Sequence, residues 1–294
     1  MTTFQRLDRV SRELQSLAAD PESLSRTFGR RVPRIARQLE VDAGRSRCLA
    51  AWGTSANFDE NARDTIVEPA ILDEIGRRSG VAIRDGEVCH AGLLHTYGYL
   101  FSTLETPYGF KRERWLQSTI ERGLQFETGT LRAIPAAGTL LGNVTWLLSH
   151  VALADLPRQR KPLTGELRDV PQSLRDCDFA RLPVTRLVET IKLSGGGRRW
   201  RTVRLISDLV ALRPRRARDI SGGSLLVYSV EDEADGRRRL ITAFAMQPNY
   251  VAALLSAENF GGRQSIRPRY NCVVPGFGTQ LRTGTRQLLD WEFR

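Results

Sequence analysis

The stretch LVETIKLSGGGRRWRTVRLI, residues 187–206, decides the fold of the C-terminal half. Apolar and polar residues alternate on both sides of Ser194-Gly195-Gly196-Gly197, and this pattern predicts two strands joined in a hairpin. A second pair of strand-like runs, 225–230 and 239–246, flanks Asp235-Gly236, a dipeptide that favours a tight turn. We therefore expect a mostly antiparallel sheet, followed by a helix at 248–257 and a strand at 266–274.

The N-terminal half has the period of helices. Leu7, Val10 and Leu14 recur at helical spacing. Similar signals predict further helices over 32–39, 70–78, 90–105, 111–122 and 139–153. The expected fold class is α+β, with a helical region, 1–156, and a β-hairpin-rich region, 173–294. We expect the two regions to form one compact domain and the helical one to carry the functional pocket.

Charge indicates an attraction to anions. The 294 residues carry a net charge of +11, and only three of the 44 basic residues are lysines. Either anion binding or a GC-rich coding bias explains this excess of arginine. The densest clusters are Arg198–Arg199 with Arg201, Arg213 with Arg215–Arg216, and Arg237–Arg239. Because Trp200 follows the first cluster, that hairpin tip is either an exposed turn or a surface that stacks a nucleic-acid base.

Several classes of protein are disfavoured by what the sequence lacks. No apolar secretory segment opens it, and the most apolar stretch, 139–153, is too short to span a bilayer. The four cysteines are scattered, which favours reduced thiols and a cytoplasmic protein without membrane association. There is no GxGxxG, GxxxxGK[ST], GxSxG or HExxH motif.

Histidines and aromatic residues suggest a pocket. His150 lies one helical turn after Trp146, so it is either a core histidine bonded to a backbone carbonyl or an axial ligand to a planar cofactor such as heme. His95 shares a helix face with Tyr99 and Ser102, either as a pocket wall or as a buried polar ladder. His90 and His95 are alternative metal ligands.

Two further pairs of residues have alternative roles. Arg112 and Arg114 either begin a solvated helix or bind a substrate carboxylate or heme propionate through their planar guanidinium groups. Cys89 and His90 could place a thiol beside an imidazole, as in acyl transfer.

The block HAGLLHTYGYLFSTLETPYGFKRERW, residues 90–115, together with the helix bearing His150, resembles the heme-dependent L-tyrosine hydroxylases of antibiotic biosynthesis. That family is distantly similar to the tryptophan 2,3-dioxygenases. The resemblance implies an oxidoreductase that uses heme iron and peroxide to hydroxylate L-tyrosine to a catechol. It also implies His150 as axial ligand, His95 and Tyr99 as catalytic residues, and Arg112 or Arg114 at a carboxylate.

Two other functions remain open from the residues. One is a cofactor-free tailoring enzyme that catalyses acyl transfer or hydrolysis on a small anionic substrate. The other is a nucleic-acid-binding protein that uses the arginine clusters, and its affinity would fall steeply with salt. The first is expected to have basic residues around one pocket, and the second to have a basic stripe.

Overall fold

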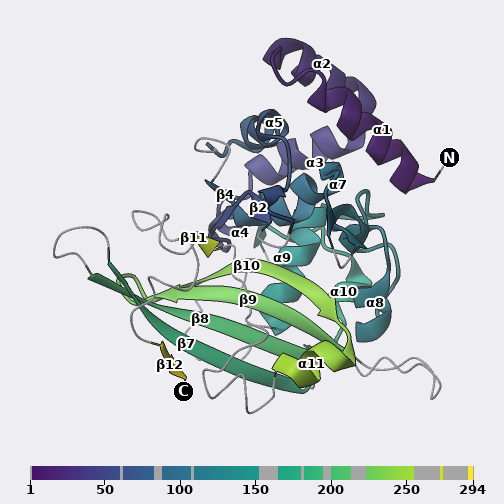
Figure 1. The fold of residues 1–294 in the computed structure, drawn as a ribbon. Coiled ribbons are helices and arrows are strands. Elements are labelled where there is room, and N and C mark those ends of the chain that lie inside the picture. The colour runs from purple at the N-terminus through teal and green to yellow at the C-terminus, as the bar shows by residue number, and fades with distance from the viewer. Residues whose placement is uncertain are drawn as a thin grey trace.

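The computed structural model has helices in the N-terminal half and a curved antiparallel sheet in the C-terminal half, so the fold class is α+β as expected (Figure 1). Within the described residues, no helix has both the length and the apolar character needed to cross a membrane. The described residues are 2–59, 62–82, 88–106, 109–151, 165–179, 182–194, 200–212, 223–254, 272–273 and 291–293.

The first helices are amphipathic and bury one face each. In the first of them, the periodic residues Leu7, Val10 and Leu14 are all buried. Thr2 caps this helix, because its hydroxyl accepts the Gln5 N–H while the Gln5 side chain accepts the Thr2 N–H. The expected helices at 32–39 and 70–78 are both present and slightly longer. The elements are α1 (Thr3–Gln15), α2 (Pro21–Arg31), α3 (Pro33–Ala43), α4 (Ser46–Ala50) and α5 (Pro69–Ser79).

The segment 90–105 is not one continuous α-helix, which corrects the expectation. A short strand precedes it, its central turn is a π-helix, and it ends at Phe101. The reason that the pattern misled is that this segment is buried on every side, so it has no polar face to fix its period. The elements are β4 (Val88–His90), α6 (Ala91–Leu93), η1 (Leu94–Gly98), α7 (Tyr99–Phe101) and β5 (Glu105–Thr106).

Side chains satisfy the carbonyl groups around the π-helix η1. The Thr96 hydroxyl donates to the Gly92 carbonyl at 2.6 Å, and the Trp115 indole N–H donates to the His95 carbonyl at 2.6 Å. Gly92 packs against Trp52 so closely that a Cβ would lie 2.7 Å from the indole ring. Single π-turns inside helices are frequent at functional sites, so η1 indicates where to look for one.

The charged segment 111–122 also differs from the single helix expected. A 3-10 helix, η2 (Lys111–Trp115), is followed by a separate helix, α8. The apolar helix expected at 139–153 and the one at 248–257 are confirmed as far as Val151 and Leu254, and the remaining residues of both expectations at their C-terminal ends lie outside the described residues. These later elements are β6 (Gly109–Phe110), α8 (Thr119–Leu124), α9 (Leu140–Val151), α10 (Gln172–Arg175) and α11 (Pro248–Leu254).

Both predicted hairpins are confirmed in a five-stranded antiparallel sheet of order β10-β9-β8-β7-β12. Ser194 pairs with Trp200 at the end of the first hairpin. The second turns at Gly236, whose φ of 60° favours glycine. Of the strand expected at 266–274, only 272–273 falls within the described residues. The strands are β7 (Val184–Ser194), β8 (Trp200–Ala211), β9 (Ser224–Asp232), β10 (Arg237–Met246) and β12 (Trp291–Phe293).

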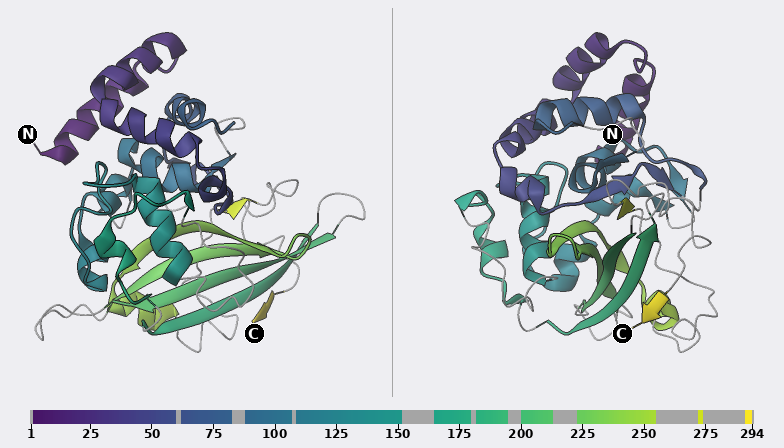
Figure 2. Two further views of the ribbon diagram at one scale, coloured as in Figure 1. Left: turned by 180° about the vertical axis from the view of Figure 1, so that it is seen from behind. Right: turned by 90° about the vertical axis from the view of Figure 1, so that its left-hand side faces the viewer.

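The helical half meets the sheet along β10, which α6 and α8 contact. Figure 2 shows the helices above the sheet in both views. The backbone of Leu240 forms two hydrogen bonds to the helical half: its N–H donates to the Ala51 carbonyl, and its carbonyl accepts the Gly53 N–H. The register of β10 shifts between Leu240 and Thr242, which is a bulge at this contact. A small sheet of order β11-β1-β4 lies close by. The remaining strands are β1 (Thr54–Ala56), β2 (Phe58–Asp59), β3 (Asp64–Thr65) and β11 (Cys272–Val273).

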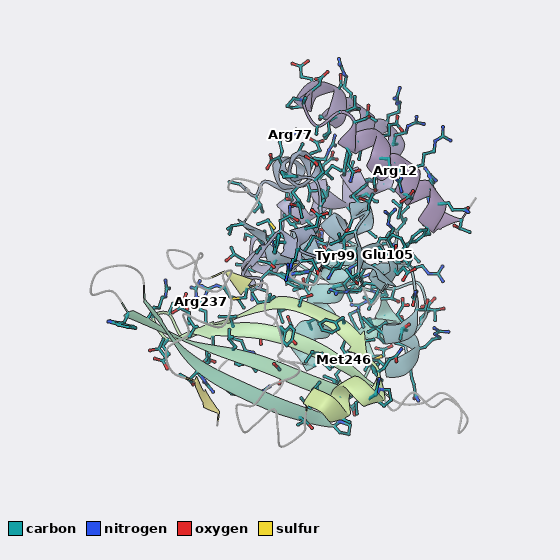
Figure 3. The ribbon with its side chains drawn as sticks, in the orientation of Figure 1. Arg12, Arg77, Tyr99, Glu105, Arg237 and Met246 are labelled. Atoms are coloured by element: carbon teal, nitrogen blue, oxygen red, sulfur yellow. The ribbon has the colours of Figure 1, made fainter. Side chains whose placement is uncertain are left out.

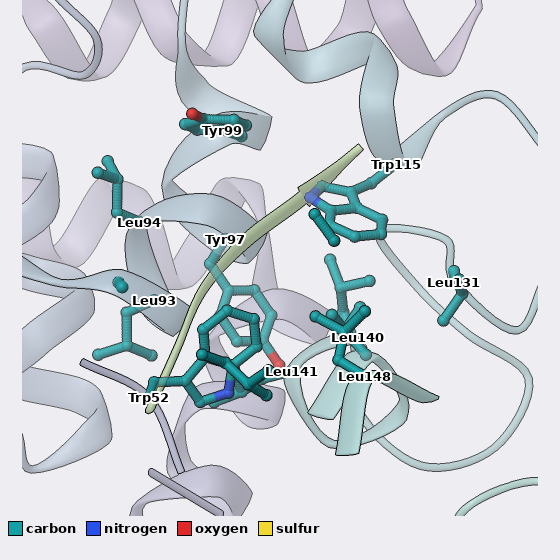
Figure 4. Close-up of a cluster of buried hydrophobic side chains, with 14 of the residues drawn as sticks. Trp52, Leu93, Leu94, Tyr97, Tyr99, Trp115, Leu131, Leu140, Leu141 and Leu148 are labelled. Atoms are coloured by element: carbon teal, nitrogen blue, oxygen red, sulfur yellow. The ribbon is translucent and has the colours of Figure 1, made fainter. Parts of the chain in front are cut away.

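A buried polar network around Asp42 braces the helical half. The Asp42 carboxylate accepts the Tyr97 hydroxyl at 2.7 Å and the Thr139 hydroxyl at 2.7 Å, and it pairs with Arg45 at 3.2 Å. Arg45 also pairs with Asp169. The network therefore ties α3, η1 and the start of α9 together. Tyr97, which belongs to this network, also lies with Trp52 and Leu141 in the apolar cluster of Figure 4.

Candidate functional site

His95 is the centre of the candidate site. It lies on the π-helix η1 and is 2% exposed. Its Nε2 is 3.1 Å from the Ser55 hydroxyl on β1. Its Nδ1 is buried and has no hydrogen-bond partner in the described part of the chain. Because a buried polar atom without a partner is unfavourable, this nitrogen calls for a ligand or a water molecule.

Two cations lie over the neighbouring ring of Tyr99. The Arg114 guanidinium is 4.6 Å from the centre of that ring, and the Lys111 ammonium is 5.8 Å from it. Both cations come from η2. Their side chains lie on the same face of it, because residues three apart eclipse each other on a 3-10 helix. The Tyr99 ring in turn meets the His95 ring edge-on at 4.8 Å. Figure 3 shows Tyr99 between the N-terminal helices and the sheet.

Arg114 and Lys111 differ in how their charge is balanced. Lys111 pairs with Asp59 at 2.6 Å. Arg114 donates a hydrogen bond to the Thr242 hydroxyl at 2.9 Å, and its guanidinium also lies 5.3 Å from the Phe244 ring. No carboxylate among the described residues pairs with it. Its pKa is lowered, because burial disfavours the charged form more than Tyr99 favours it. The guanidinium is thus an uncompensated charge, which favours an anionic ligand.

The imidazole of His95 is neutral at physiological pH. Its pKa lies well below 6.5, first because burial disfavours the imidazolium and then because Arg114 and Lys111 repel it. Trp115 links the elements that carry these groups, since it ends η2 and its indole N–H binds the His95 carbonyl on η1. A neutral imidazole fixed beside an uncompensated guanidinium can accept a proton from a water molecule or hydroxyl group next to a bound anion.

Among the described residues, the side chains of His90 and Cys89 form hydrogen bonds to backbone groups and not to each other. The His90 Nε2–H donates to the Leu49 carbonyl at 2.9 Å, and its Nδ1 accepts the Leu93 N–H at 3.2 Å, so both nitrogens cap local structure. Burial raises the pKa of the Cys89 thiol to about 12, and that thiol donates to the Ser55 carbonyl. The thiol and the imidazole are thus kept apart, because neighbouring residues on a strand point to opposite faces.

His150 lies apart from this cluster in its contacts. Its Nδ1–H donates to the Trp146 carbonyl at 2.7 Å, and its ring stacks on Trp146 at 4.5 Å and approaches Phe179 at 6.3 Å. Among the described residues, no ring contact joins it to His95 or Tyr99. The bond to a backbone carbonyl makes Nε2 the unprotonated nitrogen of the neutral ring, which is the form that binds iron.

Arg112 is turned away from Arg114 and belongs to the packing of α1. It is fully buried and pairs with Asp8 at 2.9 Å. Its guanidinium also lies 5.0 Å from the Phe4 ring and 5.8 Å from the Phe110 ring. Arg114 thus lies with His95, whereas Arg112 pairs with the N-terminal helix, and its Nε and Nη1 are buried with no hydrogen-bond partner among the described residues.

The arginines of the hairpins are largely engaged in ion pairs. Arg201 pairs with Asp232, Arg204 with Glu231, and Arg239 with Asp235. The tip clusters that most favour nucleic acid in the sequence lie outside the described residues, namely Arg198, Arg199, Arg213, Arg215 and Arg216.

Three partners of the site carry no signal in the sequence. Ser55, Thr242 and Phe244 reach it only through folding, and the last two come from the bulged strand β10. The sheet therefore contributes to the site as well as supporting it.

No family model, curated protein or solved structure matches this chain. Within the described residues, no three His, Cys, Asp or Glu side chains form a group that could hold a metal ion. The chemistry of the site is thus set by one neutral imidazole, one phenol, one paired ammonium and one uncompensated guanidinium.

Proposed function

We propose that the protein is an enzyme that acts on a small anionic substrate bound between His95, Tyr99 and Arg114. The observation that carries this proposal is the uncompensated guanidinium of Arg114 beside the partnerless Nδ1 of His95. The planar edge of a guanidinium matches the two oxygens of a carboxylate or phosphate. The Tyr99 and Phe244 rings on the guanidinium would orient it and exclude water.

In this proposal His95 is the general base. Its neutral imidazole takes a proton from a water molecule or hydroxyl group through Nδ1, while Ser55 holds Nε2 in place. The attacking oxygen adds to an acyl carbon of the substrate, and the imidazolium returns the proton to the leaving group. Arg114 holds the anionic end of the substrate. This is the acyl-transfer or hydrolytic alternative, with His95 in place of Cys89 and His90.

The substitution Arg114→Met is expected to stabilise the free protein by about 1–2 kcal/mol, because it replaces an uncompensated charge with an apolar side chain of similar size. The same change should abolish stabilisation by anions. The measurement is urea unfolding with and without benzoate, 4-hydroxyphenylacetate, citrate or inorganic phosphate.

Arg204→Met is the matched control, because Arg204 already pairs with Glu231 on the sheet. It should leave anion-induced stabilisation unchanged. If Arg114→Met instead destabilises the protein and preserves its response to anions, Arg114 is structural and the proposed site is wrong.

A second candidate is the heme-dependent hydroxylation of tyrosine implied by the sequence resemblance. The bond from His150 to the Trp146 carbonyl favours it, since the same bond fixes the tautomer of an iron-bound histidine. Bound heme would supply the activation of peroxide. His150 would hold the iron, Arg114 the carboxylate of tyrosine, and His95 a proton.

Hemin titration tests this second candidate. Wild-type protein and His95→Gln should develop a Soret band, whereas His150→Ala should not. Added tyrosine should shift the Soret band of the wild type but not that of Arg114→Met. A protein whose spectrum equals that of free hemin, or a band that persists in His150→Ala, rules out the assignment of His150.

A further inference from the structure

Positive charge is carried by the N-terminal helices and by the C-terminal part of the chain. Residues 1–47 hold ten basic and six acidic side chains, residues 48–183 hold fifteen and seventeen, and residues 184–294 hold nineteen and ten. Figure 2 shows α1 and α2 at the end of the molecule opposite the large sheet. This surface is therefore distant from the hairpins whose arginines are paired.

Five exposed arginines surround the corner where α2 ends and α3 begins. Arg30 and Arg31 end α2, with side chains 72% and 43% exposed. The Arg6 side chain on α1 reaches the Arg31 carbonyl at 3.4 Å, which brings α1 to the same corner. We call this set the corner arginines: Arg6, Arg9, Arg30, Arg31 and Arg34.

The carboxylates of these helices do not neutralise the corner. Glu13 alone pairs with corner arginines, at 2.8 Å from Arg31 and 3.9 Å from Arg30. Asp8 is engaged by Arg112 and Arg12, and Asp42 is buried. In the described part of the chain, Arg9 and Arg34 have no ion pair. Five cations therefore face one carboxylate.

We infer that the corner arginines bind the phosphate backbone of double-stranded nucleic acid. The charges are spread over three helices, which suits an extended polyanion better than one small anion. The exposed side chains among them are long cations without aromatic groups, so the contact is with phosphates rather than bases. Affinity is then independent of sequence, with a dissociation constant on the order of 10⁻⁴–10⁻⁶ M at physiological salt. The inference is independent of the proposed enzyme site.

The test is the fluorescence anisotropy of a labelled duplex of random sequence, titrated with the full chain at several salt concentrations. Wild-type affinity should fall linearly on a log–log plot against salt. Arg30→Gln/Arg34→Gln should weaken binding roughly tenfold or more and lower the slope by about 2, because each phosphate that is no longer neutralised by an arginine reduces the slope by close to one unit.

Arg168→Gln/Arg175→Gln is the matched control, because it removes the same net charge from exposed arginines elsewhere. It should bind almost as the wild type does. Equal losses in the two double variants would mean that only net charge matters, and the inference would be overturned. The inference would also be overturned if the wild-type protein did not bind the duplex, whether or not it bound vesicles containing phosphatidylserine. Circular dichroism confirms that each variant is folded.

Discussion

Replacement of Asp42 by alanine is expected to lower the free energy of unfolding by about 3–5 kcal/mol. The carboxylate is fully buried and accepts the hydroxyls of Tyr97 and Thr139 while pairing with Arg45. Its removal leaves a buried cation and two hydroxyls with fewer partners, at the junction of three helices. Chemical denaturation followed by far-UV circular dichroism measures the effect.

Asp42→Asn is the control that separates charge from hydrogen bonding. Its amide oxygen can still accept one hydroxyl, so the loss should be smaller, about 1–2 kcal/mol. Burial is the main factor that raises the pKa of Asp42 to about 6, against the hydrogen bonds and Arg45 that lower it. Equal losses for Asn and Ala would show that the charge, and not the hydrogen bonds, supports this junction.

The stability of the wild type is expected to fall as the pH drops below about 6.5, the ordinary pKa of histidine. The pKa of buried His95 is lowered, so in this pH range its imidazole binds a proton in the unfolded chain but not in the folded one. The free energy of unfolding then decreases by up to about 1.4 kcal/mol for each pH unit, until the folded group is itself protonated. Burial lowers the pKa of His90 as well and adds to the slope.

His95→Gln should reduce this slope, because glutamine does not titrate and can still bind Ser55. The measurement is urea unfolding of both proteins between pH 7.5 and about pH 6. Asp42, whose pKa is raised to about 6, opposes the trend equally in both proteins, so the difference between their slopes isolates His95. NMR of the imidazole carbons should show a neutral His95 throughout. An undiminished slope in the variant would contradict the assignment of the acid sensitivity to His95.

The sequence predicts those parts of the fold that carry a periodic pattern or a turn signal. The helix with Leu7, Val10 and Leu14 is confirmed, since its periodicity follows from burial on a single side. The hairpin around Asp235-Gly236 is confirmed through its turn dipeptide, because β9 is buried along almost its whole length. The π-turn at 94–98 was missed because residues 91–101 are buried all round, and an apolar run cannot distinguish between helix types.

The candidate site was predictable only in its local part. His95 and Tyr99 share one turn of chain, so their spacing indicates their contact. A 3-10 helix turns by about 120° per residue, against about 100° in an α-helix, and this difference places Arg114 with Lys111 and directs Arg112 to α1. Ser55 and Thr242 could not be predicted, because only tertiary contacts bring Ser55 to His95 and Thr242 to Arg114.

The position of Ser55 in the central strand of the small sheet bears on the order of assembly during synthesis. Ser55 pairs with Cys89, 34 residues along the chain, and with Cys272, 217 residues along. Closing the longer loop costs only about 1.6 kcal/mol more, since loop entropy grows with the logarithm of length. The ribosome, however, delivers Cys272 much later. The serine and the imidazole can therefore meet on a nascent chain well before the last strand closes over them.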